Sequence, residues 1–312
     1  MSSTEKEVKV EFPGLIRVFK DGSVERLFGS PHVPPTLEDP KTGVSSKDIT
    51  ISTEKNLLAR LYLPKLTTTT TNKKLPILVY FHGGGFCLES AFSLIDHRYM
   101  NNLSSQAQVI VLSVEYRLAP EHPLPAAYED CWTALNWVAS YPTDEPWIAN
   151  HADLDAIFIG GDSAGANIVH NIAMKAGQES LKCGVKILGA FLSHPYFLDE
   201  KSVPELEMAY KIWEFVYPNA AGGLESYMIN PLGGGAPSLS GIGCSRVFVV
   251  VAEKDELRDS GVRYYESVKK SGFEGIVELF EVVGEGHCFH AFNPDSDNAK
   301  VLIQRLASFL QK

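Results

Sequence analysis

Short apolar runs alternate along most of this chain with longer segments whose apolar residues recur at helical spacing. The runs are of strand length and cover residues 76–81, 109–114, 156–160, 246–252 and 276–283. Such runs are typical of strands buried on both faces of a sheet. The helical pattern is clearest over residues 126–140 and 166–176. This alternation predicts an α/β fold with a mostly parallel, twisted central sheet flanked by helices.

Two segments lie outside this alternation. The N-terminal part predicts an antiparallel hairpin that turns at Asp21-Gly22 and, further along, a strand with apolar positions Leu57, Ala59, Leu61 and Leu63. Between residues 195 and 231, the alternation gives way to a segment rich in aromatic residues. Because α/β chains of this length often fold as one unit, we expect residues 1–312 to form a single domain.

The run at residues 156–160 leads into Gly-Asp-Ser-Ala-Gly at 161–165. A strand, a tight turn with small neighbours and a following helix together form the elbow that presents a nucleophilic serine. The helix is indicated by Ile168, Ile172 and Ala176, which fall on one stripe. Ser163 is therefore the candidate nucleophile, and the amide of Ala164 faces the developing negative charge.

The run at residues 76–81 is followed directly by His-Gly-Gly-Gly at 82–85. Glycines after a buried strand allow neighbouring amide N–H groups to point at one spot, as an oxyanion hole requires. Together with the serine elbow, this tetrapeptide indicates an acyl-transfer enzyme.

A nucleophilic serine needs a histidine base, and in this architecture the base follows it along the chain. Outside the helix that carries Ser163, the later histidines are His194, His287 and His290. His287 is favoured because it lies in a loop directly after a predicted strand and before the last helix. His290 is the alternative, and His194 is more typical of a structural or pocket-wall residue.

The base also needs a carboxylate that orients it. The strand predicted at residues 246–252 ends just before Asp255, and a side chain at the carboxyl end of a parallel strand points into the ligand crevice. Asp259 is the alternative, although a helix cap or an ion pair explains it as well. Glu253 and Glu256 are interpreted as solvated.

These motifs resemble the plant carboxylesterases of the hormone-sensitive-lipase-like branch of the α/β-hydrolases. The likeness extends over nearly the whole chain, including residues 15–27 and 116–130. It implies the α/β-hydrolase fold, with a cap formed by about residues 1–45 and 195–231. It further implies a catalytic triad of Ser163, Asp255 and His287. It also implies an oxyanion hole formed by the amides of Gly83, Gly84 and Ala164.

Other members of this branch have different activities. Gibberellin receptors replace the catalytic histidine with an aliphatic residue, whereas this chain has His287. The 2-hydroxyisoflavanone dehydratases are very similar to this chain but typically carry threonine where it has Ser163. Related alkaloid cyclases have lost part of the triad. The chain departs slightly from the family at Cys288, where valine or glycine is common, and we interpret this as a packing variation.

The expected function is that of a serine carboxylesterase acting on small esters, with a dehydratase-like lyase or a silent receptor as alternatives. The mechanism calls for no metal or organic cofactor. Aromatic residues near the motifs are the candidate substrate-binding walls, namely Phe86, Tyr196, Trp213 and Phe289.

Charge and cysteine content limit the expected partners and cellular compartment. The net charge of −10 argues against nucleic acid or an anionic membrane as a partner. The polar N-terminus does not have the pattern of a signal peptide, and the five cysteines form no Cys-x-x-Cys pair. We therefore expect a cytoplasmic monomer or homodimer with reduced thiols.

Overall fold

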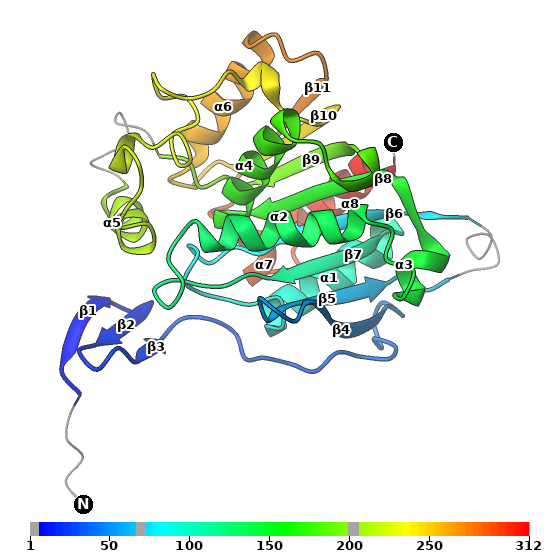
Figure 1. The fold of residues 1–312 in the computed structure, drawn as a ribbon, viewed down its shortest axis with the longest axis horizontal. Helices are drawn as coiled ribbons and strands as arrows, with labels where there is room; N and C mark the ends of the chain where they lie inside the picture. Colours follow the sequence, from blue (N-terminus) through cyan, green and yellow to red (C-terminus); the bar gives the residue numbers. More distant parts are fainter. Residues whose placement is uncertain (1–5, 67–72, 199–205, 312) are drawn as a thin grey trace, which may run out of the picture.

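The central feature of the computed structural model is an eight-stranded sheet (Figure 1). The structure describes residues 6–66, 73–198 and 206–311. Across the sheet the strands run β4 (Ser45–Ser52), β5 (Leu57–Leu63), β7 (Ile110–Glu115), β6 (Leu75–Phe81), β8 (Ala152–Asp162), β9 (Ile187–Ser193), β10 (Arg246–Ala252) and β11 (Ile276–Val282). β4, β5 and β7 pair antiparallel, and the pairs from β7 to β11 are parallel. The sheet is therefore mostly parallel, as predicted.

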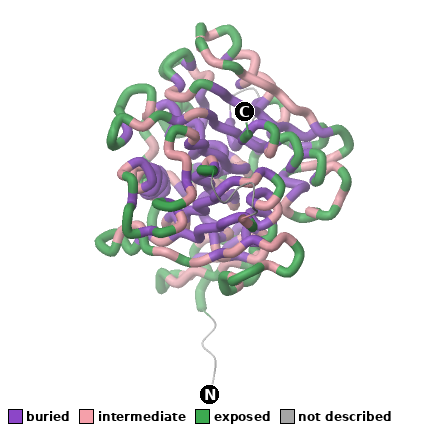
Figure 2. The backbone as a smooth tube through the Cα atoms, turned by 90° about the vertical axis from the view of Figure 1, so that its right-hand side faces the viewer, coloured by how far each residue is buried: buried purple, intermediate pink, exposed green. Residues whose placement is uncertain are grey.

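Both faces of the sheet are buried because helices cover each of them. In β6, Ile77 and Val79 belong to the core shared with α2 (Ala126–Ala139) and α4 (Ala164–Gln178). Leu78 and Tyr80 alternate with them and face the core on the other side, which includes residues of α1 (Leu94–Ala107) and α8 (Asp297–Gln311). Figure 2 shows the buried backbone running through the middle of the molecule. This alternation explains why the strands read as continuous apolar runs.

The remaining elements are shorter. A separate three-stranded sheet is built by β1 (Val8–Phe12), β2 (Ile16–Phe19) and β3 (Val24–Arg26). The hairpin predicted at Asp21-Gly22 joins β2 to β3, with Gly22 in the left-handed region at φ +84°. The other helices are α3 (Pro146–His151), α5 (Glu207–Val216), α6 (Arg258–Lys270) and α7 (Phe289–Phe292).

The two segments expected to form a cap lie on the same side of the sheet. Within the described parts of residues 1–45 and 195–231, Phe12 of β1 packs against Phe215 of α5, with ring centroids 5.1 Å apart. Residues 199–205 of the second segment are outside the described ranges. In Figure 1, β1–β3 and α5 lie at the left, beyond the carboxyl ends of the parallel strands. Loops that follow these strands meet there, so this edge is where a site is expected.

Two further features of the described chain concern its helices and its cysteines. None of its helices combines the length and apolar character needed to cross a bilayer. All five cysteines are free thiols.

Candidate active site

Ser163 stands at the sharp turn between β8 and α4. Its backbone is left-handed, with φ +54° and ψ −115°, a conformation that a residue with a Cβ adopts only when its surroundings enforce it. The neighbouring glycines allow those surroundings. A Cβ at Gly165 would lie 1.9 Å from the carbonyl oxygen of Phe81, and one at Gly161 would lie 2.5 Å from the backbone of Gly165. The close approach of elbow and strand therefore depends on both glycines.

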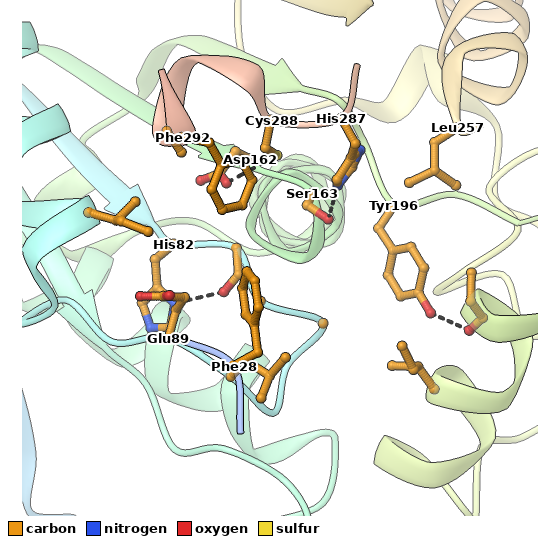
Figure 3. A pocket seen from close by; sticks show the side chains of 18 of the residues that line it. Phe28, His82, Glu89, Asp162, Ser163, Tyr196, Leu257, His287, Cys288 and Phe292 are labelled. Carbon is orange, nitrogen blue, oxygen red and sulfur yellow. Dashed lines mark hydrogen bonds between the residues drawn. The ribbon is translucent and has the colours of Figure 1, made fainter. Parts of the chain in front are cut away.

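The side chains of Ser163, His287 and Asp255 form one hydrogen-bonded chain. His287 Nε2 lies 2.9 Å from Ser163 Oγ, and His287 Nδ1 lies 2.8 Å from Asp255 Oδ2 (Figure 3 shows the first contact). Asp255 follows β10 and is anchored by accepting a hydrogen bond from the amide of Leu257 at 2.9 Å. His287 lies in the loop after β11. Segments far apart in the sequence thus bring a hydroxyl, an imidazole and a carboxylate into line.

The charge of Asp255 sets the proton affinity of His287. Burial by itself lowers the pKa of this imidazole, but the hydrogen bond and negative charge of Asp255 outweigh burial and raise the pKa above its ordinary value. The carboxylate therefore favours the protonated form of this imidazole.

The alternative base and acid lie elsewhere. His290 is buried, and its ring stacks on His194 with centroids 5.4 Å apart, so it belongs to the packing behind the site. Burial lowers the pKa of His290 to about 3. The carboxylate of Asp259 accepts a hydrogen bond from Arg258 at 2.6 Å on the surface. Neither residue contacts Ser163 in the described structure.

The glycine loop is held by hydrogen bonds to its carbonyl groups. Tyr116 donates to the carbonyl oxygens of His82 and Gly83, at 2.7 and 3.3 Å, and His82 Nδ1 donates to the Gly83 carbonyl at 2.8 Å. In a planar trans peptide the N–H points opposite to the C=O. Anchoring these two carbonyls therefore orients the amides of Gly83 and Gly84. The amide of Ala164 is at the start of α4, where N–H groups lack partners within the helix.

A cavity of about 490 Å³ opens over Ser163. Residues from both expected cap segments line it, among them Leu15 and Phe28 from the first and Tyr196 and Ile212 from the second. Tyr196 therefore lies in the wall, and its hydroxyl donates a hydrogen bond to the carbonyl of Ala209.

The other three predicted wall residues do not line this cavity. Phe86 and Trp213 are fully buried and pack against each other, with ring centroids 6.3 Å apart. Phe289 is buried against His194 at 5.8 Å. The expectation was wrong because aromatic character marks burial as readily as ligand contact. At Phe86, the left-handed backbone, with φ +62°, belongs to a turn that places the ring in the core.

Several cavity residues were missed by the sequence reasoning, in particular Phe28, Glu89, Leu257 and Phe292. Phe28 comes from the N-terminal segment and Phe292 from the end of α7. Their rings meet edge to face, with centroids 6.0 Å apart. Their unusual exposure, 38% and 57%, separates them from the core aromatics, but it is visible only in the structure.

No cluster of three or more His, Cys, Asp or Glu side chains able to hold a metal ion is found among the described residues. Cys288 is buried beside the base, and its thiol lies 3.5 Å from Asp162 Oδ2. The expected packing variation therefore places a thiol against the carboxylate next to the nucleophile.

Comparison with known proteins agrees with this geometry. Residues 78–291 match the family described as the alpha/beta hydrolase fold. The chain is 52% identical to a 2-hydroxyisoflavanone dehydratase of Glycyrrhiza echinata, with 99% of this chain and 98% of that protein covered. It is 43% identical to "Probable carboxylesterase 1" of Arabidopsis thaliana, with 99% of each covered. Among solved structures, the esterase LipW from Mycobacterium marinum is similar, with a TM-score of 0.74, 26% identity and coverage of 88% of this chain and 83% of that chain. The chain belongs to the α/β-hydrolase family.

Proposed function

We propose that this chain is a serine carboxylesterase that hydrolyses small carboxylic esters through an acyl-enzyme on Ser163. The observation that carries the proposal is the chain of contacts from Ser163 through His287 to Asp255, at 2.9 and 2.8 Å. A serine hydroxyl is a weak nucleophile at neutral pH, and this arrangement supplies the base that activates it.

In the acylation step, His287 Nε2 takes the proton of Ser163 as its oxygen attacks the ester carbonyl. Asp255 stabilises the resulting imidazolium through Nδ1. The carbonyl oxygen becomes an oxyanion that accepts hydrogen bonds from the amides of Gly83, Gly84 and Ala164. Each such donor contributes about 2.7–4 kcal/mol to lowering the barrier.

The intermediate then collapses, and His287 gives its proton to the departing alcohol. Water repeats the sequence on the acyl-enzyme, with His287 again as the base, and the carboxylic acid leaves. Each proton moves between groups that this chain itself supplies.

The size of the cavity, about 490 Å³, suits small esters. We propose that the segments at about 1–45 and 195–231 act as its cap, since both supply lining residues. Tyr196 would then limit the space beside the nucleophile.

The test is covalent labelling. A fluorophosphonate should add one organophosphate to Ser163, and an aryl ester should give a burst of the aryl alcohol. Ser163→Ala should lose both while remaining folded, and Ser308→Ala, at an exposed position of α8, should retain both. Near-normal ester turnover by Ser163→Ala would overturn the proposal.

A second candidate is a dehydratase-like lyase, because a relative 52% identical is named 2-hydroxyisoflavanone dehydratase. Loss of water from a β-hydroxy ketone needs the oxyanion hole to polarise the ketone and His287 to take the adjacent proton, but no acyl-enzyme. We favour the esterase because Ser163 contacts His287 directly. Faster dehydration of a 2-hydroxyisoflavanone than hydrolysis of every small ester tried would reverse this preference.

A silent receptor is the remaining alternative. Such a protein has no use for an activated serine, whereas the imidazole of His287 lies 2.9 Å from Ser163 Oγ. Tight binding of a hormone-like ligand, without a burst from an activated ester, would support the receptor.

A further inference from the structure

The two sides of the cavity differ in chemistry. Figure 3 shows Phe28, His82, Glu89 and Phe292 on one side of Ser163, with Tyr196 and Leu257 on the other. The lining also includes apolar side chains of residues 206–212, among them Leu206, Met208 and Ile212. We call the first side the acceptor side, defined by Phe28, His82, Glu89 and Phe292.

Glu89 places a carboxylate on the acceptor side. It accepts hydrogen bonds from the amide and hydroxyl of Ser30, at 3.0 and 3.4 Å. No lysine or arginine of the described residues forms an ion pair with it. Lys254 is the one lysine or arginine among the described cavity residues, and it lies next to the triad acid. Glu89 is therefore a cavity carboxylate without an ion-pair partner among the described lysines and arginines.

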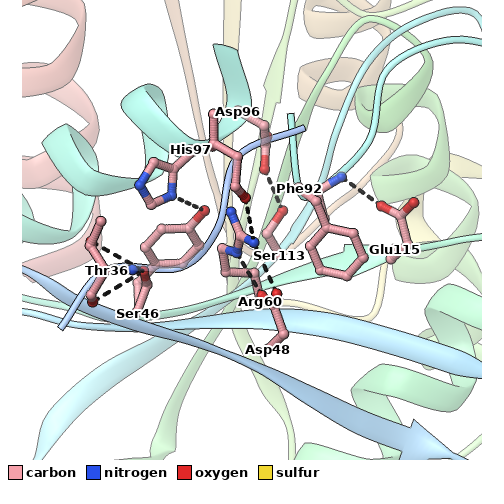
Figure 4. A network of polar contacts seen from close by, with 12 residues as sticks. Thr36, Ser46, Asp48, Arg60, Phe92, Asp96, His97, Ser113 and Glu115 are labelled. Carbon is pink, nitrogen blue, oxygen red and sulfur yellow. Dashed lines mark hydrogen bonds and ion pairs between the residues drawn. The ribbon is translucent and has the colours of Figure 1, made fainter. Parts of the chain in front are cut away.

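The neighbouring acidic groups do not share this role. Asp96 is buried and accepts a hydrogen bond from Ser113 at 2.8 Å (Figure 4), and Asp162 is buried and accepts one from Tyr80. Burial raises the pKa of both carboxyl groups. The guanidinium of Arg60 forms an ion pair with the carboxylate of Asp48 at 2.6 Å (Figure 4), so it is not paired with Glu89.

His82 also lines the cavity, but its ring is packed against Tyr116, with centroids 4.2 Å apart. Since its Nδ1 donates to the Gly83 carbonyl, its Nε2 carries the lone pair of a neutral ring. Burial lowers the pKa of this imidazole to about 4. Only 2% of His82 is exposed, and Nε2 has no partner among the described residues. The ring therefore belongs to the packing beneath the glycine loop and is not offered to a ligand.

Phe28 and Phe292 complete the acceptor side with exposed aromatic rings, edge to face at 6.0 Å. Aromatic faces attract organic cations and bind the apolar carbons around the charge. A carboxylate and two aromatic rings thus occur together, and no lysine or arginine of the described residues pairs with that carboxylate.

We propose that the acceptor side binds a protonated amine, so that the preferred substrates are small esters carrying an ammonium group. This inference rests on the proposed function and names the substrate class of that site. The ammonium charge would face Glu89, its N–H would donate to the Glu89 carboxylate, and its alkyl groups would contact Phe28 and Phe292.

Binding of three alcohols of nearly equal shape tests this without turnover. N,N-dimethylethanolamine at a pH where it is protonated carries charge and an N–H, choline carries charge alone, and 3,3-dimethylbutan-1-ol carries neither. We expect dissociation constants, measured by calorimetry, to rise in that order, with about a tenfold span between the first and the last. Equal or tighter binding of the neutral alcohol would overturn the proposal.

Variants locate the effect. Glu89→Gln keeps an acceptor for Ser30 but removes the charge. The preference for the amine is the dissociation constant of 3,3-dimethylbutan-1-ol divided by that of N,N-dimethylethanolamine, and it should fall to about one third of the wild-type ratio or less. Phe292→Leu, at an exposed ring, should weaken choline binding more than binding of the neutral alcohol. Glu256→Gln removes a carboxylate that lines the cavity beside the triad acid, and it should leave the preference within about twofold. An unchanged preference in Glu89→Gln, or an equal loss in Glu256→Gln, would contradict the assignment.

Ester assays then separate this inference from the proposed function. Butyrate esters of the three alcohols should be hydrolysed with kcat/KM in the same order as the affinities. If neutral esters are hydrolysed with no preference for the amine, this inference fails and the esterase stands. If no ester is hydrolysed, the esterase fails and the dissociation constants still decide the amine site.

Discussion

The hydroxyl of Tyr116 donates a hydrogen bond to the carbonyl oxygen of His82 at 2.7 Å, and the two rings stack with centroids 4.2 Å apart. Tyr116 also reaches the carbonyl of Gly83 at 3.3 Å. One buried phenol therefore holds both peptide groups whose amides we propose as the glycine part of the oxyanion hole.

Tyr116→Phe should lower kcat by about tenfold with little change in KM, because the amides lose orientation toward an oxyanion that exists only in the transition state. The ratio of kcat for an ester to kcat for the matching thionoester should also fall toward one. The negative sulfur of the thionoester transition state accepts hydrogen bonds from the oxyanion hole more weakly than oxygen does, so it loses less in the variant. Tyr128→Phe is the matched control, because it removes a buried hydroxyl that donates to Asn167 at 2.7 Å outside the loop. The idea fails if both variants keep the wild-type ratio.

His287→Ala should abolish phosphonylation of Ser163 and leave unfolding nearly unchanged, since the His287 side chain is 38% exposed. His290→Ala should have the opposite effect. It should lower the free energy of unfolding by about 1–3 kcal/mol, because a buried ring is lost, yet retain labelling. Mass spectrometry and denaturant titration measure the two effects. Labelling lost in His290→Ala alone would reassign the base.

The pH dependence of kcat/KM should follow His287. The base must be neutral, so activity should rise with pH, with a midpoint above the ordinary value of 6.5 because Asp255 raises the pKa. In Asp255→Asn the charge is gone, and the residual activity should rise at lower pH than in the wild type. A midpoint that does not move would show that Asp255 does not act on the titrating group.

Gly165→Ala should destabilise the fold by more than about 3 kcal/mol or prevent folding, because its Cβ would lie 1.9 Å from the carbonyl oxygen of Phe81. Gly235→Ala is the control, since a Cβ there meets nothing within 4 Å. Its free energy of unfolding should change by less than about 1 kcal/mol. Equal stability of the two variants would mean that the elbow can move away from β6.

Ser163→Thr should reduce ester hydrolysis more than dehydration of a β-hydroxy ketone. The β-branched hydroxyl is crowded in attacking a carbonyl, whereas dehydration needs no covalent step. Both activities measured on the same two proteins give the comparison. A larger loss in dehydration would favour the lyase.

Much of the fold, and the turns that carry the candidate site residues, follow from local patterns. The strand predicted at residues 246–252 coincides with β10, and the helix predicted over residues 126–140 ends within one residue of α2. Apolar period and turn glycines act over a few residues, so the sequence carries them directly. The same holds for the turns at Ser163 and at Gly83.

The tertiary structure decided which of several similar residues meet. His287 and His290 are three positions apart, yet one contacts Ser163 and the other stacks on His194, because the loop after β11 turns between them. Aromatic rings divide in the same way: Trp213 is buried, whereas Phe28 and Phe292 meet at the cavity from opposite ends of the chain. These outcomes depend on backbone direction and on packing between distant segments, which no local pattern of hydrophobic and polar residues encodes.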